Sequence, residues 1–192
     1  MLTVRTQSRL VRDEDGVSAV EFALVAPFLI LLLMGTIEFP RAYGISQGLE
    51  KGARTMADLI SRGSLNSVDD VYAAGSAVTF PYDTSAAKVV LTSVGVYPKG
   101  QGLVARVCST VSRNDTPPGV DSELGEPIPS EAKAGARYVT VKVSFRYVPV
   151  FSIFPSLDNL TFTKIVSWPV RGTGTNSLAE TVLPGGKVCK SG

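Results

Sequence analysis

Residues 17–37 read VSAVEFALVAPFLILLLMGTI, and Glu21 is the only charged residue among them. A helix of this length spans roughly 30 Å at 1.5 Å per residue, which is about the thickness of the hydrocarbon core of a bilayer. A soluble domain of this size has no need for so long an apolar run. The stretch therefore predicts a membrane-spanning helix, and the rest of the chain is interpreted outward from it.

The segment before this helix, residues 1–16, is a short charged leader that reads MLTVRTQSRLVRDEDG. Basic residues that flank a span favour the cytoplasmic side of the membrane, and acidic residues count for little. The three arginines of the leader therefore predict a cytoplasmic N-terminus and a C-terminal part on the other side. Basic residues also follow the span and oppose this orientation: Arg41, Lys51 and Arg54.

Two other kinds of apolar N-terminal segment compete with this interpretation. A secretory signal peptide has a shorter apolar stretch that ends in a small-x-small cleavage site, and no good site follows Gly35 here. A plain anchor that is never cleaved fits the composition equally well. The signal peptide is therefore disfavoured, whereas the uncleaved anchor stays open.

Glu21 is the residue that a plain anchor does not explain. A carboxylate inside a span costs up to about 2.5 to 3.5 kcal/mol on insertion scales, so one interpretation places Glu21 at headgroup level, near the positive end of the helix dipole. The other interpretation uses Gly16. A cut after Gly16 would give Val17 a charged amine one helical turn from Glu21, on the same face. The two groups could then pair within a subunit or between neighbours, and the pair would set the register of packed helices.

The junction Gly16-Val-Ser-Ala-Val-Glu21-Phe22, followed by ALVAPFLILLLMGTIEFPR, resembles the TadE-like pseudopilins of the Tad (Flp) branch of type IV pilus systems. The resemblance covers roughly residues 12–62, and the remainder matches only loosely. Several features found together in one apolar helix carry it: Gly16, Glu21, Phe22, Pro27 and Glu38-Phe39.

The resemblance implies cleavage by a prepilin peptidase between Gly16 and Val17, and a role in assembly for Glu21, Phe22 and Pro27. It implies a minor subunit of a thin pilus, anchored once in the bacterial inner membrane with a periplasmic C-terminal domain. The implied partners are sister pseudopilins, the major pilin, the inner-membrane pilus platform and the lipid bilayer. Whether the subunit initiates, caps or is distributed through the fibre stays open.

Pro40 departs from the pattern of the family, where a small residue is expected. A proline at this position removes the hydrogen bond to the carbonyl of Thr36 and crowds that turn. It therefore predicts a kink and argues against a helix that runs straight into the following domain.

Composition narrows the class of protein further. The net charge of +2 argues against a dedicated nucleic-acid binder, and the chain has no histidine, the commonest general base and metal ligand. Serine chemistry without histidine would need a Ser-Lys pair; the Ser-x-x-Lys spacing occurs at Ser85–Lys88 and Ser130–Lys133, but the Ser-Asp-Asn and Lys-Thr-Gly elements that accompany it in penicillin-binding proteins are missing from the sequence. We therefore expect no enzyme, cofactor or metal site. The alternative to a pseudopilin is an uncleaved, membrane-anchored binding module or an adhesin-like accessory protein.

The remainder of the chain predicts an α+β fold of the type IV pilin kind, with a long N-terminal helix packed on a small antiparallel sheet. Beyond the leader (1–16) and the span (17–39), apolar spacing predicts a helical stalk over 40–63, and a periplasmic domain occupies 64–192. Three glycines at four-residue spacing in the stalk are expected to contact the sheet: Gly44, Gly48 and Gly52.

Start and alternation signals place the elements of this domain. Ser67, followed by two aspartates, predicts the start of a short helix that runs to about Val78. Strands are predicted by alternating or Val- and Thr-rich runs, and Pro169 places the last of them at an edge. Their expected ranges are 86–97, 103–113, 137–147 and 160–171.

Two further features keep open interpretations. The acidic, proline-rich segment 114–135 is either a partner-binding loop or a disordered insertion. Cys108 and Cys189 fit no zinc pattern, so they form a disulfide if the domain lies outside the cytosol, or else stay as two free thiols.

Overall fold

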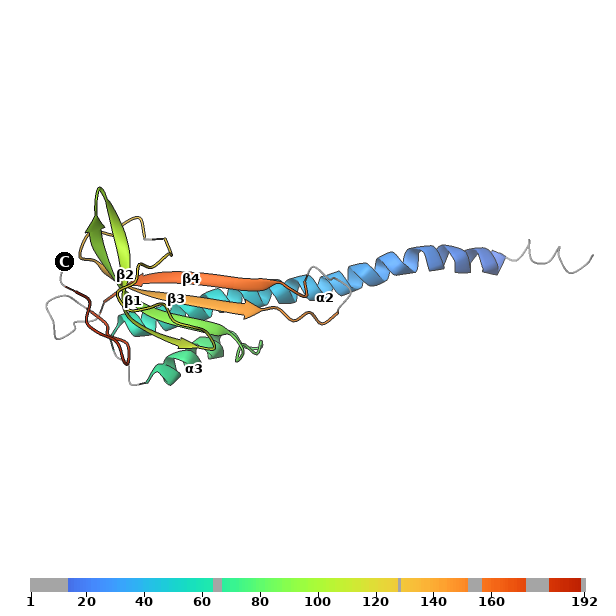
Figure 1. Cartoon of the computed structure of the whole chain (residues 1–192). Coiled ribbons are helices and arrows are strands. Elements are labelled where there is room, and N and C mark those ends of the chain that lie inside the picture. Colours follow the sequence, from blue (N-terminus) through green and yellow to red (C-terminus); the bar gives the residue numbers. More distant parts are fainter. Residues whose placement is uncertain (1–13, 64–66, 128, 152–156, 172–179, 191–192) are drawn as a thin grey trace, which may run out of the picture. The chain divides into compact units, whose positions relative to one another are not determined.

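A computed structural model describes residues 14–63, 67–127, 129–151, 157–171 and 180–190 (Figure 1). The chain forms two compact units that meet between Arg41 and Ala42, and each is described by itself. The arrangement is α+β, as predicted. Its elements are α2 (Glu14–Ser61), α3 (Val68–Val78), β1 (Lys88–Lys99), β2 (Gly102–Arg113), β3 (Arg137–Arg146) and β4 (Thr161–Pro169).

Helix α2 is one continuous helix of 48 residues, with Pro27 and Pro40 both inside it. The helix continues through Pro40 into the predicted stalk, and the kink predicted at Pro40 stays a prediction. A proline removes a single backbone donor, and the i→i−4 bonds of the turns on either side remain to hold the helix. The helix ends at Ser61, and two residues later Gly63 takes a positive φ of 72° and donates its N–H to the carbonyl of Ile60.

The four strands form one antiparallel sheet in the order β2-β1-β3-β4. β1 and β2 make a hairpin in which Lys99 pairs with Gly102, and their bounds lie close to the predicted ones. β4 is an edge strand, and Pro169 lies at its end, as predicted. Alternation along β3 is confirmed too, because Val139, Val141 and Val143 are all buried in the core.

The core lies between one face of this sheet and the part of α2 that begins at Ala42. Apolar residues recur along α2 at spacings of three and four, which places them on one face of the helix. That face packs on the alternate residues of β1 and β3 that point the same way. The buried helix residues are Ala42, Ile45, Leu49, Ala53, Met56, Ala57 and Ile60.

Helix α3 begins as predicted: the Ser67 side chain accepts a hydrogen bond from the backbone N–H of Asp69 at 3.1 Å. The expected contact of the α2 glycines with the sheet is wrong, because the glycines face α3 and the turn after it. A Cβ added to Gly52 would lie 2.8 Å from the carbonyl oxygen of Gly75, so the backbones meet where α2 lacks a side chain. The larger apolar side chains of α2 occupy the face toward the sheet instead.

The acidic segment 114–135 is an ordered part of the domain over its described residues, not a disordered insertion. Three backbone hydrogen bonds join it to the outer edge of β2, among them one from the Leu124 N–H to the Ala105 carbonyl at 2.9 Å. Three of its five carboxylates form ion pairs within the domain: Glu123 with Lys99 (2.7 Å), Glu126 with Lys142 (3.3 Å) and Asp121 with Lys190 (3.0 Å).

Candidate processing and assembly segment

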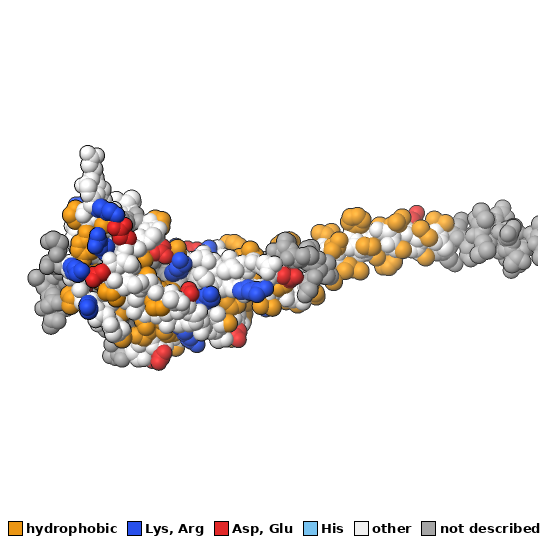
Figure 2. Space-filling view, in the orientation of Figure 1, with side chains coloured by type: hydrophobic (Ala, Val, Ile, Leu, Met, Phe, Trp, Pro, Cys, Tyr) orange, Lys and Arg blue, Asp and Glu red, His pale blue; other side chains and the backbone are white. Residues whose placement is uncertain are grey.

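The N-terminal part of α2, residues 17–37, carries apolar side chains on every side and one charged residue, Glu21. It is the one helix among the described residues that is long and apolar enough to cross a membrane. Its most apolar stretch of 18 residues has a mean hydropathy of 2.4, and none of those residues is buried. Figure 2 shows hydrophobic side chains covering the visible side of this part of the helix. Burial of one large apolar side chain contributes about 1.5 to 3 kcal/mol, so water is a poor environment for this surface. The segment is compatible with a single-pass membrane anchor.

The predicted cleavage site lies in the first turn of α2. Gly16 is exposed, and nothing lies within 4 Å of the position that a Cβ would take there. The first four N–H groups of a helix have no partner inside it, so this turn opens at little cost. Of the leader, residues 1–13 lie outside the described part of the chain. The geometry at Gly16 and Val17 therefore leaves the bond between them accessible.

Glu21 lies one turn beyond Val17 on the same face of α2, and its side chain is exposed. Among the described residues it has no recorded hydrogen bond or ion pair. Phe22 is exposed next to it. Pro27 is exposed as well, but six residues at 100° each place it on a different side of the helix. The three residues with a predicted assembly role therefore share one helix without forming a single patch.

Glu38, near the other end of the apolar run, received no role of its own from the sequence. In the structure its side chain is fully buried, at 0% exposure, whereas the following Phe39 is exposed. A buried carboxylate is costly unless other groups satisfy it, and this burial marks the residue as structurally important. The signal that could have found it is a second carboxylate at the boundary of an otherwise apolar helix.

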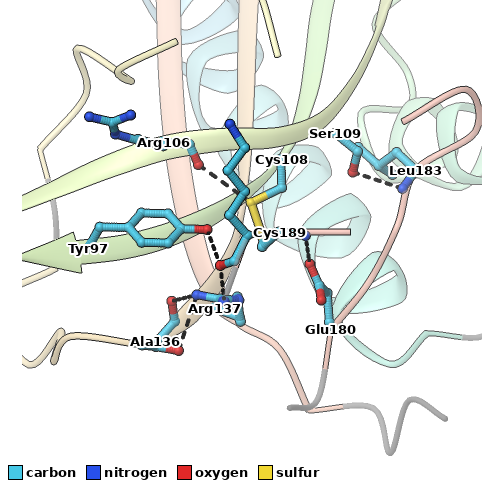
Figure 3. The surroundings of a disulfide bond; sticks show 11 residues. Tyr97, Arg106, Cys108, Ser109, Ala136, Arg137, Glu180, Leu183 and Cys189 are labelled. Carbon is cyan, nitrogen blue, oxygen red and sulfur yellow. Dashed lines mark hydrogen bonds between the residues drawn. A yellow bond between two sulfur atoms is a disulfide. The ribbon is translucent and has the colours of Figure 1, made fainter. Parts of the chain in front are cut away.

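The two cysteines are joined in the sheet domain (Figure 3). Cys108 on β2 and Cys189 in the C-terminal tail form a disulfide with an S–S distance of 2.00 Å and a Cα–Cα distance of 4.7 Å. The sequence left a disulfide and two free thiols open, and the structure has the disulfide. Other contacts hold the same tail: the Leu183 N–H donates to Ser109 Oγ (2.9 Å), and Tyr97 Oη (2.8 Å) and Arg137 Nη2 (3.2 Å) donate to the Lys190 carbonyl.

Glu180 lies beside this disulfide and accepts a hydrogen bond from the backbone N–H of Cys189. With the two sulfurs it makes the single group of three potential metal-binding side chains in the part of the chain that the structure describes. Thiolates bind metals, whereas sulfurs joined in a disulfide are not available as thiolates. The arrangement is therefore a structural crosslink rather than a metal site.

The comparison with known proteins gives a match for helix α2 and none for the sheet domain. The model of the family described as TadE-like protein matches residues 16–58. Over this segment the chain is similar to that family. The matched segment begins at Gly16 and contains Glu21, Phe22 and Pro27, so the resemblance drawn from the sequence is confirmed there. No curated protein and no solved structure matches the chain.

Proposed function

We propose that this chain is a minor pseudopilin of a Tad (Flp) pilus, cut after Gly16 by a prepilin peptidase and assembled through its N-terminal helix. The observation that carries the proposal is the TadE-like match over residues 16–58. The match begins at the proposed cut and covers the apolar helix, and it leaves the sheet domain out. The part of the chain that is TadE-like is thus the part to which the proposal assigns processing and assembly.

The chemistry of the cut explains why Glu21 stands in an apolar helix. Cleavage gives Val17 a free, charged amine, and the Glu21 carboxylate lies one turn away on the same face. In lipid an unpaired carboxylate at the helix centre costs about 2.5 to 3.5 kcal/mol, and an opposite charge offsets that cost. A neighbouring subunit can supply the amine as well as the same chain can. Pairing between subunits would fix how far one helix slides along the next.

The other candidate is an uncleaved, membrane-anchored binding module with an adhesin-like role. A groove of about 580 Å³ favours it. The groove lies on the face of the sheet that is opposite to the core. Thr92, Thr140 and Ile165 line its sheet side, and Pro118 and Leu124 of the acidic segment line the other. A module of this kind needs its anchor but not the cut, so the state of the N-terminus separates the two candidates.

The mature N-terminus is therefore the first measurement. Intact mass and N-terminal sequencing of the native protein should find a chain that starts at Val17. The same protein from cells without an active prepilin peptidase should keep residues 1–16 and serves as the control. An intact leader in cells with active peptidase would remove the pseudopilin proposal and leave the anchored module.

The second measurement separates the charge of Glu21 from its size. Glu21→Gln keeps the shape and removes the charge, whereas Glu21→Ala removes both. Both variants should be cut and inserted normally, but recovery of partner subunits should fall about tenfold for each 1.4 kcal/mol lost. Normal pilus assembly by Glu21→Gln would show that pairing with the amine is not what Glu21 does.

A further inference from the structure

The outer edge of β4 carries backbone groups that its neighbour β3 does not use. Where the two strands begin to pair, the Tyr147 N–H donates to the Leu160 carbonyl at 2.8 Å, and the paired residues then follow one by one along both strands. Hydrogen-bonded and non-hydrogen-bonded pairs alternate in an antiparallel ladder, so the even-numbered residues of β4 turn their backbone groups toward β3. The odd-numbered residues, from Thr161 to Pro169, therefore turn theirs outward.

The outward row of backbone groups is open among the described residues. Pro169 agrees with this assignment, because it has no N–H to donate and lies where no neighbouring strand needs one. The residues of the row that do have an N–H make no recorded backbone hydrogen bond on that side: Thr161, Thr163, Ile165 and Ser167. Thr161, Thr163 and Ile165 are exposed, so nothing closes this edge of the sheet.

The opposite edge of the sheet, along β2, is closed by the chain itself. There the acidic segment supplies backbone partners to β2, with the Asp121 N–H donating to the Val107 carbonyl at 2.8 Å and the Val107 N–H donating to the Ser122 carbonyl at 3.0 Å. A strand edge with unpaired groups is a template for pairing with another chain. Of the two edges, β4 is the one that another chain can join, and a second copy can join it only through its own β4 (Figure 1).

The backbone pattern of β4 is complementary to itself when a second copy runs antiparallel to it about Ile165. Each outward-facing residue then meets an outward-facing residue of the second copy. Ile165 lies opposite Ile165 and Thr163 lies opposite Ser167, and each of these pairs can exchange two N–H···O=C bonds. The missing donor of Pro169 falls at the end of the ladder, opposite Thr161, where it removes one bond and leaves the others in place.

The side chains of β4 favour the same register. Ile165 is 43% exposed and would be covered by the Ile165 of the second copy. Lys164, the one charged residue of β4, would lie opposite Val166 and can keep its ion pair with Glu50 at 3.6 Å. A shift of two residues in one direction would place Lys164 opposite its own copy, and like charges directly opposite each other are destabilising. A shift in the other direction would separate the two isoleucines.

We propose that two copies of this chain pair through β4, antiparallel and in register about Ile165, so that their sheets become one. The interface has the same strand on both sides and leaves neither β4 edge open. β4 runs in the same direction as the adjacent part of α2, since Lys164 contacts Glu50 and the Arg171 N–H donates to the Ser61 carbonyl at 2.8 Å. The two α2 helices therefore enter the joined sheet from opposite ends, and the contact is separate from packing between N-terminal helices.

Single cysteines test the pairing and its register. Full-length protein is placed in lipid nanodiscs at one copy per disc, so that the N-terminal helices of two copies do not meet in one bilayer. Mild oxidation of Ile165→Cys should link two copies, because the Cα atoms of a hydrogen-bonded antiparallel pair lie about 5.5 Å apart, within reach of a disulfide. Thr161→Cys is the matched control on the same edge. In this register its copy lies about 27 Å away, so its yield of linked dimer gives the background.

Mixed variants and a change of charge complete the test. Thr163→Cys and Ser167→Cys should link to each other more than either links to itself. Ile165→Lys should weaken the pairing about tenfold in sedimentation of the discs, whereas Ile165→Val should leave it unchanged. A yield from Ile165→Cys no greater than that from Thr161→Cys would overturn the proposal and leave the edge to a strand of another protein. Uncleaved protein gives the same readout, so failure of the pseudopilin proposal leaves this result intact.

Discussion

Reduction of the disulfide between Cys108 and Cys189 is expected to lower the free energy of unfolding of the sheet domain by about 3 to 4 kcal/mol. The bond links residues separated by 81 positions in the sequence. In the chain-entropy model, closure of a loop of this length restricts the unfolded chain by about 4.5 kcal/mol at 25 °C. The measured loss should be smaller, because a reduced unfolded chain keeps some residual structure.

The folded state should change little on reduction, since the tail has other attachments. Leu183 is buried in the core, and Tyr97 and Arg137 both donate to the carbonyl of Lys190. The effect therefore falls mainly on the unfolded chain, which becomes less compact without the crosslink. A less compact unfolded chain exposes more surface, so the dependence of stability on urea should also become steeper.

The assay is urea unfolding of the full-length protein in detergent, followed by the emission of Trp168. For a slope of about 2 kcal/mol per molar urea, reduction should lower the midpoint by about 2 M. The variant Cys108→Ala/Cys189→Ala should match the reduced protein and should not respond to reductant. Equal midpoints for oxidised and reduced protein, with both thiols shown by mass to be free, would refute the reasoning.

The remaining predictions concern α3 and use the same urea assay. Gly52→Ala should cost about 1 to 3 kcal/mol despite a gain of about 1 kcal/mol in helix propensity, because the new Cβ would lie 2.8 Å from the Gly75 carbonyl oxygen. Gly48→Ala, one turn away, meets nothing closer than 3.5 Å and should be neutral or stabilising; equal losses for the two would contradict the packing of α3 on α2. Tyr72→Phe should leave stability at pH 7 unchanged or higher, since that hydroxyl is buried without a recorded partner among the described residues. Burial raises the pKa of Tyr72 above 10.0, so the folded state holds its proton at a pH where the unfolded state loses it, and stability falls as pH rises through that range. The variant should lose less stability there, and an identical alkaline fall in both proteins would count against it. Ser67→Ala should cost about 1 kcal/mol through loss of the helix cap and should speed amide exchange in the first turn of α3; unchanged exchange would argue against the cap.

Most secondary structure could be predicted from the sequence, because the signals for it are local. Alternation of Val139, Val141 and Val143 with polar residues specifies a strand with one buried face, and Ser67 before two aspartates specifies a helix start. The local preference of Pro40 acts against a helix, whereas the hydrogen bonds of the neighbouring turns keep α2 continuous through it.

The candidate processing and assembly segment likewise has one feature that the sequence predicts and one that it does not. The spacing of Gly16, Val17 and Glu21 could be interpreted from the sequence, because helical geometry alone sets which residues share a face. The burial of Glu38 could not, since the exposed fraction of a side chain is a property of the folded chain that no local pattern records.

The sequence by itself determined the apolar helix, the positions of the four strands and the two cysteines available for a crosslink. These depend on residue type and on spacings of two or three to four residues, which neighbours along the chain settle. Only the tertiary structure decided that the glycines of α2 meet α3, that lysines of β1 and β3 pair with two glutamates of the acidic segment, and that β1 lies between β2 and β3. Such contacts join residues far apart in the chain, so they are chosen by how well whole surfaces pack and pair, and no local pattern records that choice.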